Sequence, residues 1–143
     1  MTDQEIVMLA EAWIAHKRSR DRDKETEPHG GYSDRSCKLY RAQEKVSDLE
    51  LEHENPEILW KLILAIQHID HSAPIQQILS AGLIENLLSN HGEAFIARIE
   101  AEAKRDPSFA STLGGVWKNS MTDEVWTRLK LVWDRRGWDD VPK

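Results

Sequence analysis

The chain has 143 residues, of which 40% are hydrophobic and 31% are charged, the balance of an ordinary globular domain. It holds no apolar run near the roughly 18 residues of a membrane span, and its acidic start differs from the basic start of a signal peptide. The net charge of −6 argues against sequence-independent nucleic-acid binding. Because a single cysteine cannot form an internal disulfide, we expect a cytoplasmic protein.

The first third of the chain predicts two helices separated by a polar segment. Apolar residues at helical spacing predict a helix over 3–17, and a 3-4-3 spacing predicts a second helix over 35–53. Residues 18–33 contain no aliphatic residue larger than alanine and include a Pro-His-Gly-Gly sequence. We expect these residues to form a flexible loop.

The remainder of the chain predicts a series of shorter helices. Asn55-Pro56 is a helix start signal, and the helix it opens runs to about residue 70. Helices follow at 74–80 and 83–90, broken by Gly82 and stopped by Gly92, and then at 93–104. Asp106-Pro107 opens a short helix, and a last helix covers about 122–135.

These patterns predict an all-α protein with one domain over residues 1–143, because no segment shows the two-residue alternation of a strand. We expect about seven helices. Their short joints favour a compact orthogonal bundle, and a short α-solenoid of the HEAT type is the alternative.

The segment 113–126 is the most unusual part of the chain. Gly114-Gly115 lies between two helical patterns and is followed closely by Trp117. Glycine permits positive φ or close backbone approach, so the pair predicts a tight helix joint. It lacks the Lys-Ser/Thr sequence that follows the glycines of a phosphate-binding loop.

Metal-binding and catalytic motifs are incomplete. His68 and His71 have helical i, i+3 spacing, and Glu50 with His53 forms one Glu-x-x-His element, whereas di-iron bundles need two such elements and two further glutamates. Cys37 begins a helix but belongs to no nucleophile motif. We therefore expect no metal, no cofactor and no enzymatic activity.

Acidic residues gather near the end of the second predicted helix. Glu44, Asp48 and Glu52 share one stripe at i, i+4 and i+8, and Glu50 and Glu54 lie nearby. Like charges at this spacing are mildly destabilising, so they add nothing to the fold. The stripe is either a solvated face or a docking surface for a basic partner.

The chain also has six tryptophans. Four lie on apolar helical stripes and are expected in the core: Trp13, Trp60, Trp126 and Trp133. Trp117 and Trp138 do not lie on an apolar stripe. Because tryptophan is a common anchor of protein interfaces, these two residues are candidates for contact with a partner.

Several motifs resemble a family of small uncharacterised bacterial proteins, a domain of unknown function. They lie at residues 11–16, 56–60, 81–88, 91–96, 99–103 and 105–109, and in the Leu-Gly-Gly-Val-Trp-x-Asn corner at 113–119. The chain departs from the family pattern at Leu83, where proline is expected. The resemblance implies an identity without an activity. By analogy of size alone, such proteins are similar to immunity proteins and single-domain inhibitors.

We therefore hypothesise a non-enzymatic protein-binding module of immunity or inhibitor type. It would occlude a partner protein, such as a toxin or an enzyme with a basic surface, and contact neither nucleic acid nor membrane. The candidate partner-binding residues are Glu44, Asp48, Glu50, Glu52, Glu54, Trp117 and Trp138. The alternatives are a small helical enzyme or metal-dependent protein, and a structural subunit that self-associates through its C-terminal helix.

Overall fold

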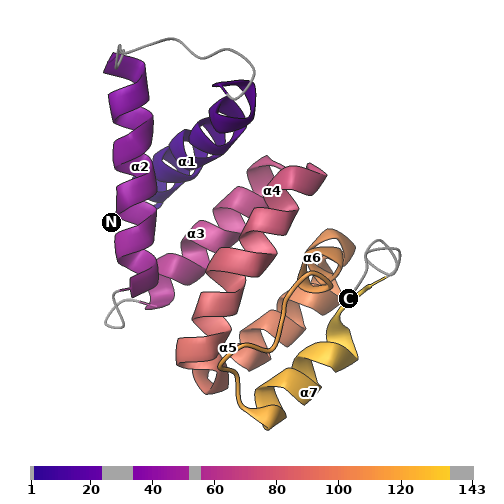
Figure 1. Ribbon diagram of the computed structural model, residues 1–143. Coiled ribbons are helices and arrows are strands. Elements are labelled where there is room, and N and C mark those ends of the chain that lie inside the picture. The colour runs from indigo at the N-terminus through magenta and orange to yellow at the C-terminus, as the bar shows by residue number, and fades with distance from the viewer. Residues whose placement is uncertain (1, 24–33, 52–55, 136–143) are drawn as a thin grey trace. The chain divides into compact units, whose positions relative to one another are not determined.

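The computed structural model describes residues 2–23, 34–51 and 56–135, and every regular element in these ranges is helical. The all-α prediction is therefore confirmed. The elements are α1 (Asp3–Asp23), α2 (Asp34–Leu51), α3 (Pro56–Ile69), α4 (Ala73–Ile78), the π-helical segment η1 (Leu79–Ile84), α5 (Glu85–Arg105), α6 (Pro107–Leu113) and α7 (Asp123–Val132) (Figure 1). Because α4, η1 and α5 join without a break, the described ranges hold six continuous helical stretches. None of these helices is long and apolar enough to cross a membrane.

Contacts divide the chain into two compact units, residues 1–70 and 71–143. In the first unit, α1 packs against both α2 and α3. The three helices bury one apolar stripe each, formed by Ile6, Ala10, Trp13, Ile14, Ala42, Val46, Leu49, Leu59, Trp60, Leu62, Ile63 and Ile66. Trp13 and Trp60 therefore lie in the core as expected. The single domain over 1–143 stays a prediction.

Helix α1 is longer than its apolar pattern indicates. It continues to Asp23, so the predicted loop over 18–33 is wrong for residues 18–23, and residues 24–33 lie outside the described ranges. The Arg18 guanidinium donates from Nε and Nη2 to Oδ2 of Asp70, at 2.9 and 2.6 Å. An ion pair with the residue that follows α3 thus holds α1 beyond the end of its apolar pattern.

The second unit begins with a helix that continues through Gly82, so the predicted break there is wrong. The helix does change its hydrogen-bonding pattern, since η1 spans Leu79–Ile84. Leu79, Leu83 and Ile84 are buried, and their packing outweighs the roughly 1 kcal/mol by which glycine disfavours a helix.

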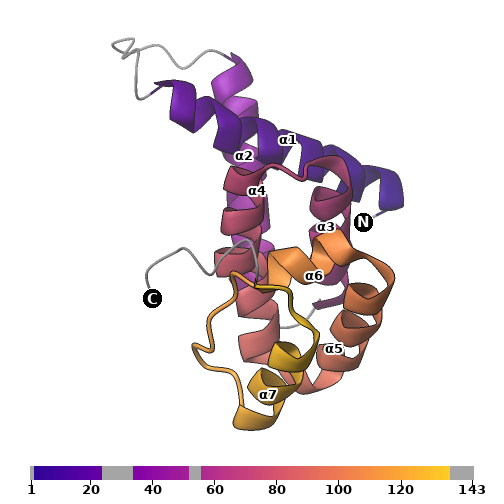
Figure 2. The same cartoon turned by 90° about the vertical axis from the view of Figure 1, so that its right-hand side faces the viewer.

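The predicted stop at Gly92 corresponds to a sharp kink in α5. The preceding residue, His91, has non-helical φ and ψ of −136° and 27°. Figures 1 and 2 show the second half of α5 turning back from the first half at this point. α5 is therefore two helices joined at His91, as the glycine pattern indicates.

Helix α7 packs against α5 and ends three residues earlier than predicted, at Val132. The Arg128 guanidinium donates to the Glu100 carboxylate, an ion pair between α7 and α5 that lowers the pKa of Glu100. Trp126 and Trp133 are half-buried, so their prediction as core residues is wrong. Their rings instead contact each other edge to face, with centroids 5.3 Å apart.

Candidate functional site

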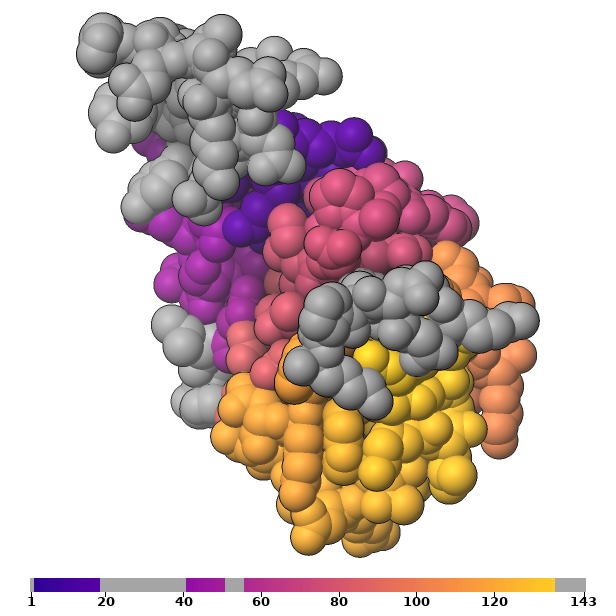
Figure 3. Space-filling model, turned by 45° about the vertical axis from the view of Figure 1, so that its right-hand side comes forward, coloured from indigo at the N-terminus to yellow at the C-terminus, as the bar shows by residue number. Residues whose placement is uncertain are grey.

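The connection between α6 and α7, residues 114–122, is called the corner loop below. Figure 3 shows it at the surface of the second unit, next to α7. Three successive backbone hydrogen bonds tighten its start, from the N–H groups of residues 114, 115 and 116 to the carbonyls of residues 111, 112 and 113. Gly114 is buried and has φ −60° and ψ −20°. The predicted tight joint is thus confirmed.

A carboxylate at the start of α5 holds the middle of the corner loop. Glu85 accepts hydrogen bonds from the backbone N–H of Trp117 and from the side chain of Asn119. Asn119 has φ 44°, in the left-handed region that asparagine tolerates better than most residues. Val116 and Met121, on either side, are buried. The loop backbone is therefore fixed by two apolar contacts and one carboxylate.

Sequence reasoning did not identify Glu85, because it lies far from the corner loop along the chain. The only local signal was Asn119 in a glycine-containing joint, where a left-handed residue is common. No pattern in the sequence pairs it with one particular acid.

Burial raises the pKa of Glu85 above its ordinary value of 4.5, and the hydrogen bonds from Asn119 and Trp117 oppose this rise. A folded state with the higher pKa binds the proton more tightly than the unfolded chain does. The contribution of Glu85 to stability is therefore greatest at low pH, and it falls as pH rises through 4.5 toward the folded pKa.

Glu85→Gln keeps a hydrogen-bond acceptor at this position and removes the titration. We expect the wild type to lose stability relative to this variant as pH rises above 4.5. Urea unfolding of both proteins across this range measures the difference. A difference that does not vary with pH would show that folding leaves the pKa of Glu85 unchanged, and it would contradict this prediction.

Trp117 is the one aromatic residue of the corner loop. Its surface is 63% accessible to solvent, whereas the neighbouring Val116 is buried. Tryptophan is highly buried on average in folded proteins. The neighbours Lys118, Asn119 and Ser120 are exposed and polar, and Lys118 forms an ion pair with Asp123. A large apolar side chain thus projects from a fixed backbone within a polar surround.

The acidic stripe lies in the other unit, on α2. Glu44 and Asp48 are exposed and Glu50 is half-buried, whereas Glu52 and Glu54 lie outside the described residues. Arg41 and Lys45 are also exposed on α2, one turn apart, and they border the acidic pair. The described part of the stripe is therefore balanced in charge, and Arg41 is the residue that the prediction overlooked.

The residues considered for metal binding and catalysis are described only in part. His68 and His71 are both exposed, and His53 lies outside the described ranges. Within those ranges, no group of three or more His, Cys, Asp or Glu side chains is arranged to hold a metal ion. Nδ1 of His71 instead lies 3.2 Å from Oγ of Ser108, a contact that links the connection between α3 and α4 to the first turn of α6.

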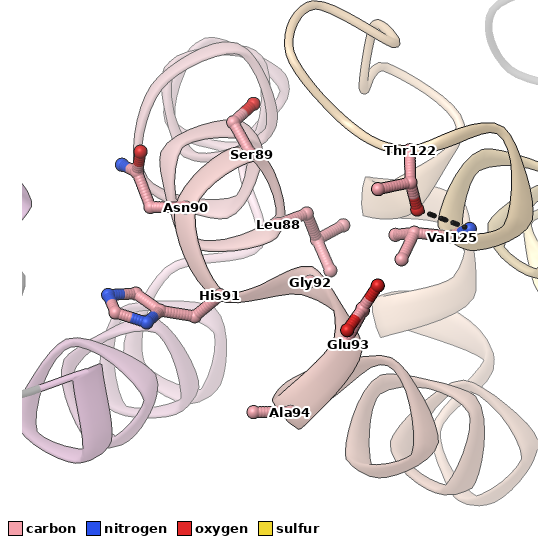
Figure 4. Close-up of a pocket in the computed structure, with 9 residues that line it drawn as sticks. All are labelled: Leu88, Ser89, Asn90, His91, Gly92, Glu93, Ala94, Thr122 and Val125. Carbon is pink, nitrogen blue, oxygen red and sulfur yellow. Dashed lines mark hydrogen bonds between the residues drawn. The ribbon is translucent and has the colours of Figure 1, made fainter.

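A cavity of about 320 Å³ lies where α5 kinks. It is lined by Leu88, Ser89, Asn90, His91, Gly92, Glu93, Ala94, Thr122 and Val125 (Figure 4). Thr122 is the last residue of the corner loop and caps α7, since its Oγ1 accepts a hydrogen bond from the N–H of Val125 at 3.2 Å. The cavity therefore adjoins the corner loop at its C-terminal end.

The family model for DUF6869, described as a family of unknown function, matches residues 36–137. The chain belongs to this family. The match agrees with the expectation that the chain holds a domain of unknown function. No curated protein and no solved structure matches the chain.

The DUF6869 match covers the corner loop, Glu85 and the kink cavity. It excludes α1 and also Trp138, which lies outside the described residues too. Of the two tryptophans selected as interface candidates, Trp117 is therefore the one that lies within the family's own domain.

Proposed function

We propose that this DUF6869 protein is a non-enzymatic protein-binding module that docks its partner on the corner loop, with Trp117 as the anchor. The observation that carries the proposal is an exposed tryptophan on a backbone held in place by Glu85, Val116 and Met121. Interface hot spots are enriched in tryptophan and lie within a polar rim, which Lys118, Asn119 and Ser120 supply here.

The fixed loop also favours tight binding. Ordering a mobile segment at an interface opposes association, and a backbone already held by hydrogen bonds avoids most of this cost. The Glu85 carboxylate holds the peptide N–H of Trp117 itself, so the anchor is supported at its own backbone.

The finer proposal is an immunity or inhibitor type of action, in which the bound module covers a basic surface of a partner such as a toxin or an enzyme. The net charge of −6 supports this choice, because opposite charges steer two proteins together and speed association. Cytoplasmic location belongs to the same proposal.

Self-association through α7 is the second candidate, and one observation favours it. Leu131 is 78% exposed near the end of α7, the helix that also carries the half-buried Trp126. A large exposed apolar side chain on a helix suits contact with a second copy. Sedimentation of the wild type and of Leu131→Ala would test it, and a monomeric wild type would exclude this candidate.

Trp117→Ala is expected to weaken partner binding by about thirtyfold or more, because truncating an interface hot spot costs at least about 2 kcal/mol. It should leave the free energy of unfolding within about 0.5 kcal/mol, since exposed side chains contribute little. The partner would be isolated from the source cell by affinity capture, and binding would then be measured with the purified pair.

Two further variants are compared with Trp117→Ala. Lys118→Ala, next to the anchor and also exposed to solvent, is the control and should change affinity little. Glu44→Lys with Asp48→Lys tests the acidic stripe, and slower association at low salt would assign it a steering role. Undiminished affinity in Trp117→Ala would reject the corner loop as the docking surface.

A further inference from the structure

We propose that the exposed face of α1 in one copy of this protein contacts the exposed end of α7 in a second copy. This inference rests on the second candidate function, self-association through α7, and it names the surface that Leu131 meets. Two observations carry it: the apolar side chains that each surface exposes, and the opposite charges that surround them.

Helix α1 exposes large apolar side chains outside its buried stripe. The stripe, which includes Trp13, packs on α2 and α3. Val7 and Met8 are instead 41% and 61% exposed, and helical spacing places them on one face with the exposed Gln4 and Glu11, called the α1 face below. The solvent side of a surface helix is ordinarily polar. Two adjacent exposed apolar residues therefore make the α1 face a candidate contact surface.

The α1 face is acidic. Residues 3–12 include no basic residue and three exposed acids: Asp3, Glu5 and Glu11. Asp3 lies 3.7 Å from the ammonium of Lys61, and Glu5 accepts a hydrogen bond at the start of its own helix. Glu11 forms no ion pair with the described residues, and it lies three and four residues from the two apolar side chains. A carboxylate is thus available at the edge of the apolar pair.

The end of α7 combines an exposed apolar side chain with the opposite charge. Leu131 and Lys130 are both exposed there and are called the α7 face below, and Nζ of Lys130 lies 5.6 Å from the ring centroid of Trp126. The guanidinium of Arg135 follows, 5.1 Å from the ring centroid of Trp133. Residues 127–135 hold three basic residues and one acid, so this end of the helix is basic.

The two faces match each other in charge and in apolar character. Contact between Met8 and Leu131 would remove apolar surface from water, which is the main favourable term in most protein association. Exposed ion pairs add little affinity, but opposite charges speed association and set the orientation of the two copies. Both faces are exposed in one copy, α1 in residues 1–70 and α7 in residues 71–143. A second copy therefore supplies the chemistry that each face requires.

Sedimentation of the full chain over a range of concentrations is the first test. The two faces differ, so their contact is heterologous and a pair of copies still has one open face of each kind. We expect species larger than a dimer to form as the concentration of the wild type rises. A wild type that stays monomeric, or that associates only as far as a dimer, would overturn the proposal.

A mixture of two variants tests the pairing of the faces directly. Met8→Lys disables the α1 face and Leu131→Glu disables the α7 face, and both residues are exposed, so both variants should fold. Each variant alone should be monomeric. Their equimolar mixture should form a dimer, because one variant keeps the α7 face and the other keeps the α1 face. A mixture that stays monomeric, with both folds intact by circular dichroism, would refute the assignment.

Val7→Lys and Ile69→Lys form a matched pair, because both residues are β-branched and 41% exposed. Val7→Lys brings a cation to the basic α7 face, so it should raise the dissociation constant by about tenfold or more. Ile69→Lys, on α3, should leave it unchanged. Equal effects of the two substitutions would show that the α1 face has no particular role.

A charge exchange within one chain tests the ionic contribution. Glu11→Lys and Lys130→Glu should each weaken association, and a chain with both substitutions should associate more tightly than either single variant, because the opposite charges are restored across the contact. A double variant that associates no better than the single variants would contradict the pairing of these two faces.

These results can be told apart from failure of the proposed function. If the wild type is monomeric, self-association through α7 falls together with this inference, whereas docking on Trp117 is unaffected. If the wild type associates but the mixture of Met8→Lys and Leu131→Glu does not, only the assignment of the α1 face falls.

Discussion

Gly92→Ala is expected to destabilise the protein by about 1–3 kcal/mol, the usual cost of adding a methyl group to a well-packed contact. The added Cβ would lie 3.0 and 3.1 Å from the two γ-carbons of Val125. Val125 is buried and β-branched, so it has little freedom to turn away, and α7 must move instead. Urea unfolding of the variant and the wild type measures the loss.

Gly82→Ala is the matched control for this substitution. An added Cβ at Gly82 meets no atom within 4 Å, and the residue lies inside a continuous helix. We expect a gain of about 0.4–1 kcal/mol, because alanine has less conformational freedom to lose than glycine. A double variant, Gly92→Ala with Val125→Ala, should cost less than the sum of its parts, since the two side chains compete for one space. Additive costs would contradict the close contact between α5 and α7.

Arg18→Ala should cost about 1–3 kcal/mol, because it removes two hydrogen bonds from a carboxylate that is only 8% exposed. The expected loss of stability stays below the roughly 3–5 kcal/mol that breaking a fully buried ion pair costs, because the Arg18 side chain is 57% exposed and solvent screens it. Asp70 also lies at the C-terminal end of α3, where a negative charge is unfavourable to the helix dipole. Unfolding in urea and the helical signal of α1 are the two readouts.

Lys61→Ala provides the comparison for Arg18→Ala. Its ion pair with Asp3 is 3.7 Å long and joins two exposed side chains, so its loss should change stability by less than about 0.5 kcal/mol. Arg18→Lys retains the charge without the two-donor geometry. Its cost in stability should therefore lie between the costs of Arg18→Ala and Lys61→Ala. An Arg18→Ala cost as small as that of Lys61→Ala would mean that Asp70 is satisfied without its guanidinium partner.

Most helices of the protein follow from local sequence patterns. Asparagine or aspartate before proline marks the starts of α3 and α6, and in α6 the Asp106 carboxylate accepts the hydrogen bond from the N–H of Ser108 that such a cap requires. The apolar stripes of α1, α2 and α3 are the stripes that the first unit buries. These features are local, so the chain's own periodicity predicts them.

The candidate site was only partly predictable. The glycine pair indicated a tight joint at the corner loop, and Trp117 stood out because no apolar stripe accounted for it. The acidic residues on α2 were selected on charge, and this selection overlooked Arg41, which the helix places one turn before Lys45. Gly92 indicated the interruption of α5, but no local pattern indicated the cavity that forms beside it, because Thr122 and Val125 reach it from a distant part of the chain.

The sequence by itself thus determined the helical class, most helix starts, the tight joint at the glycine pair and the membership of a family of unknown function. Only the tertiary structure decided that α1 continues to Asp23, that Gly82 leaves its helix intact, and that Glu85 holds the corner loop. The physical reason is the range of the interactions. Helix caps and apolar periodicity act within a few residues, whereas the ion pair of Arg18 and the hydrogen bonds of Glu85 join residues that are distant along the chain.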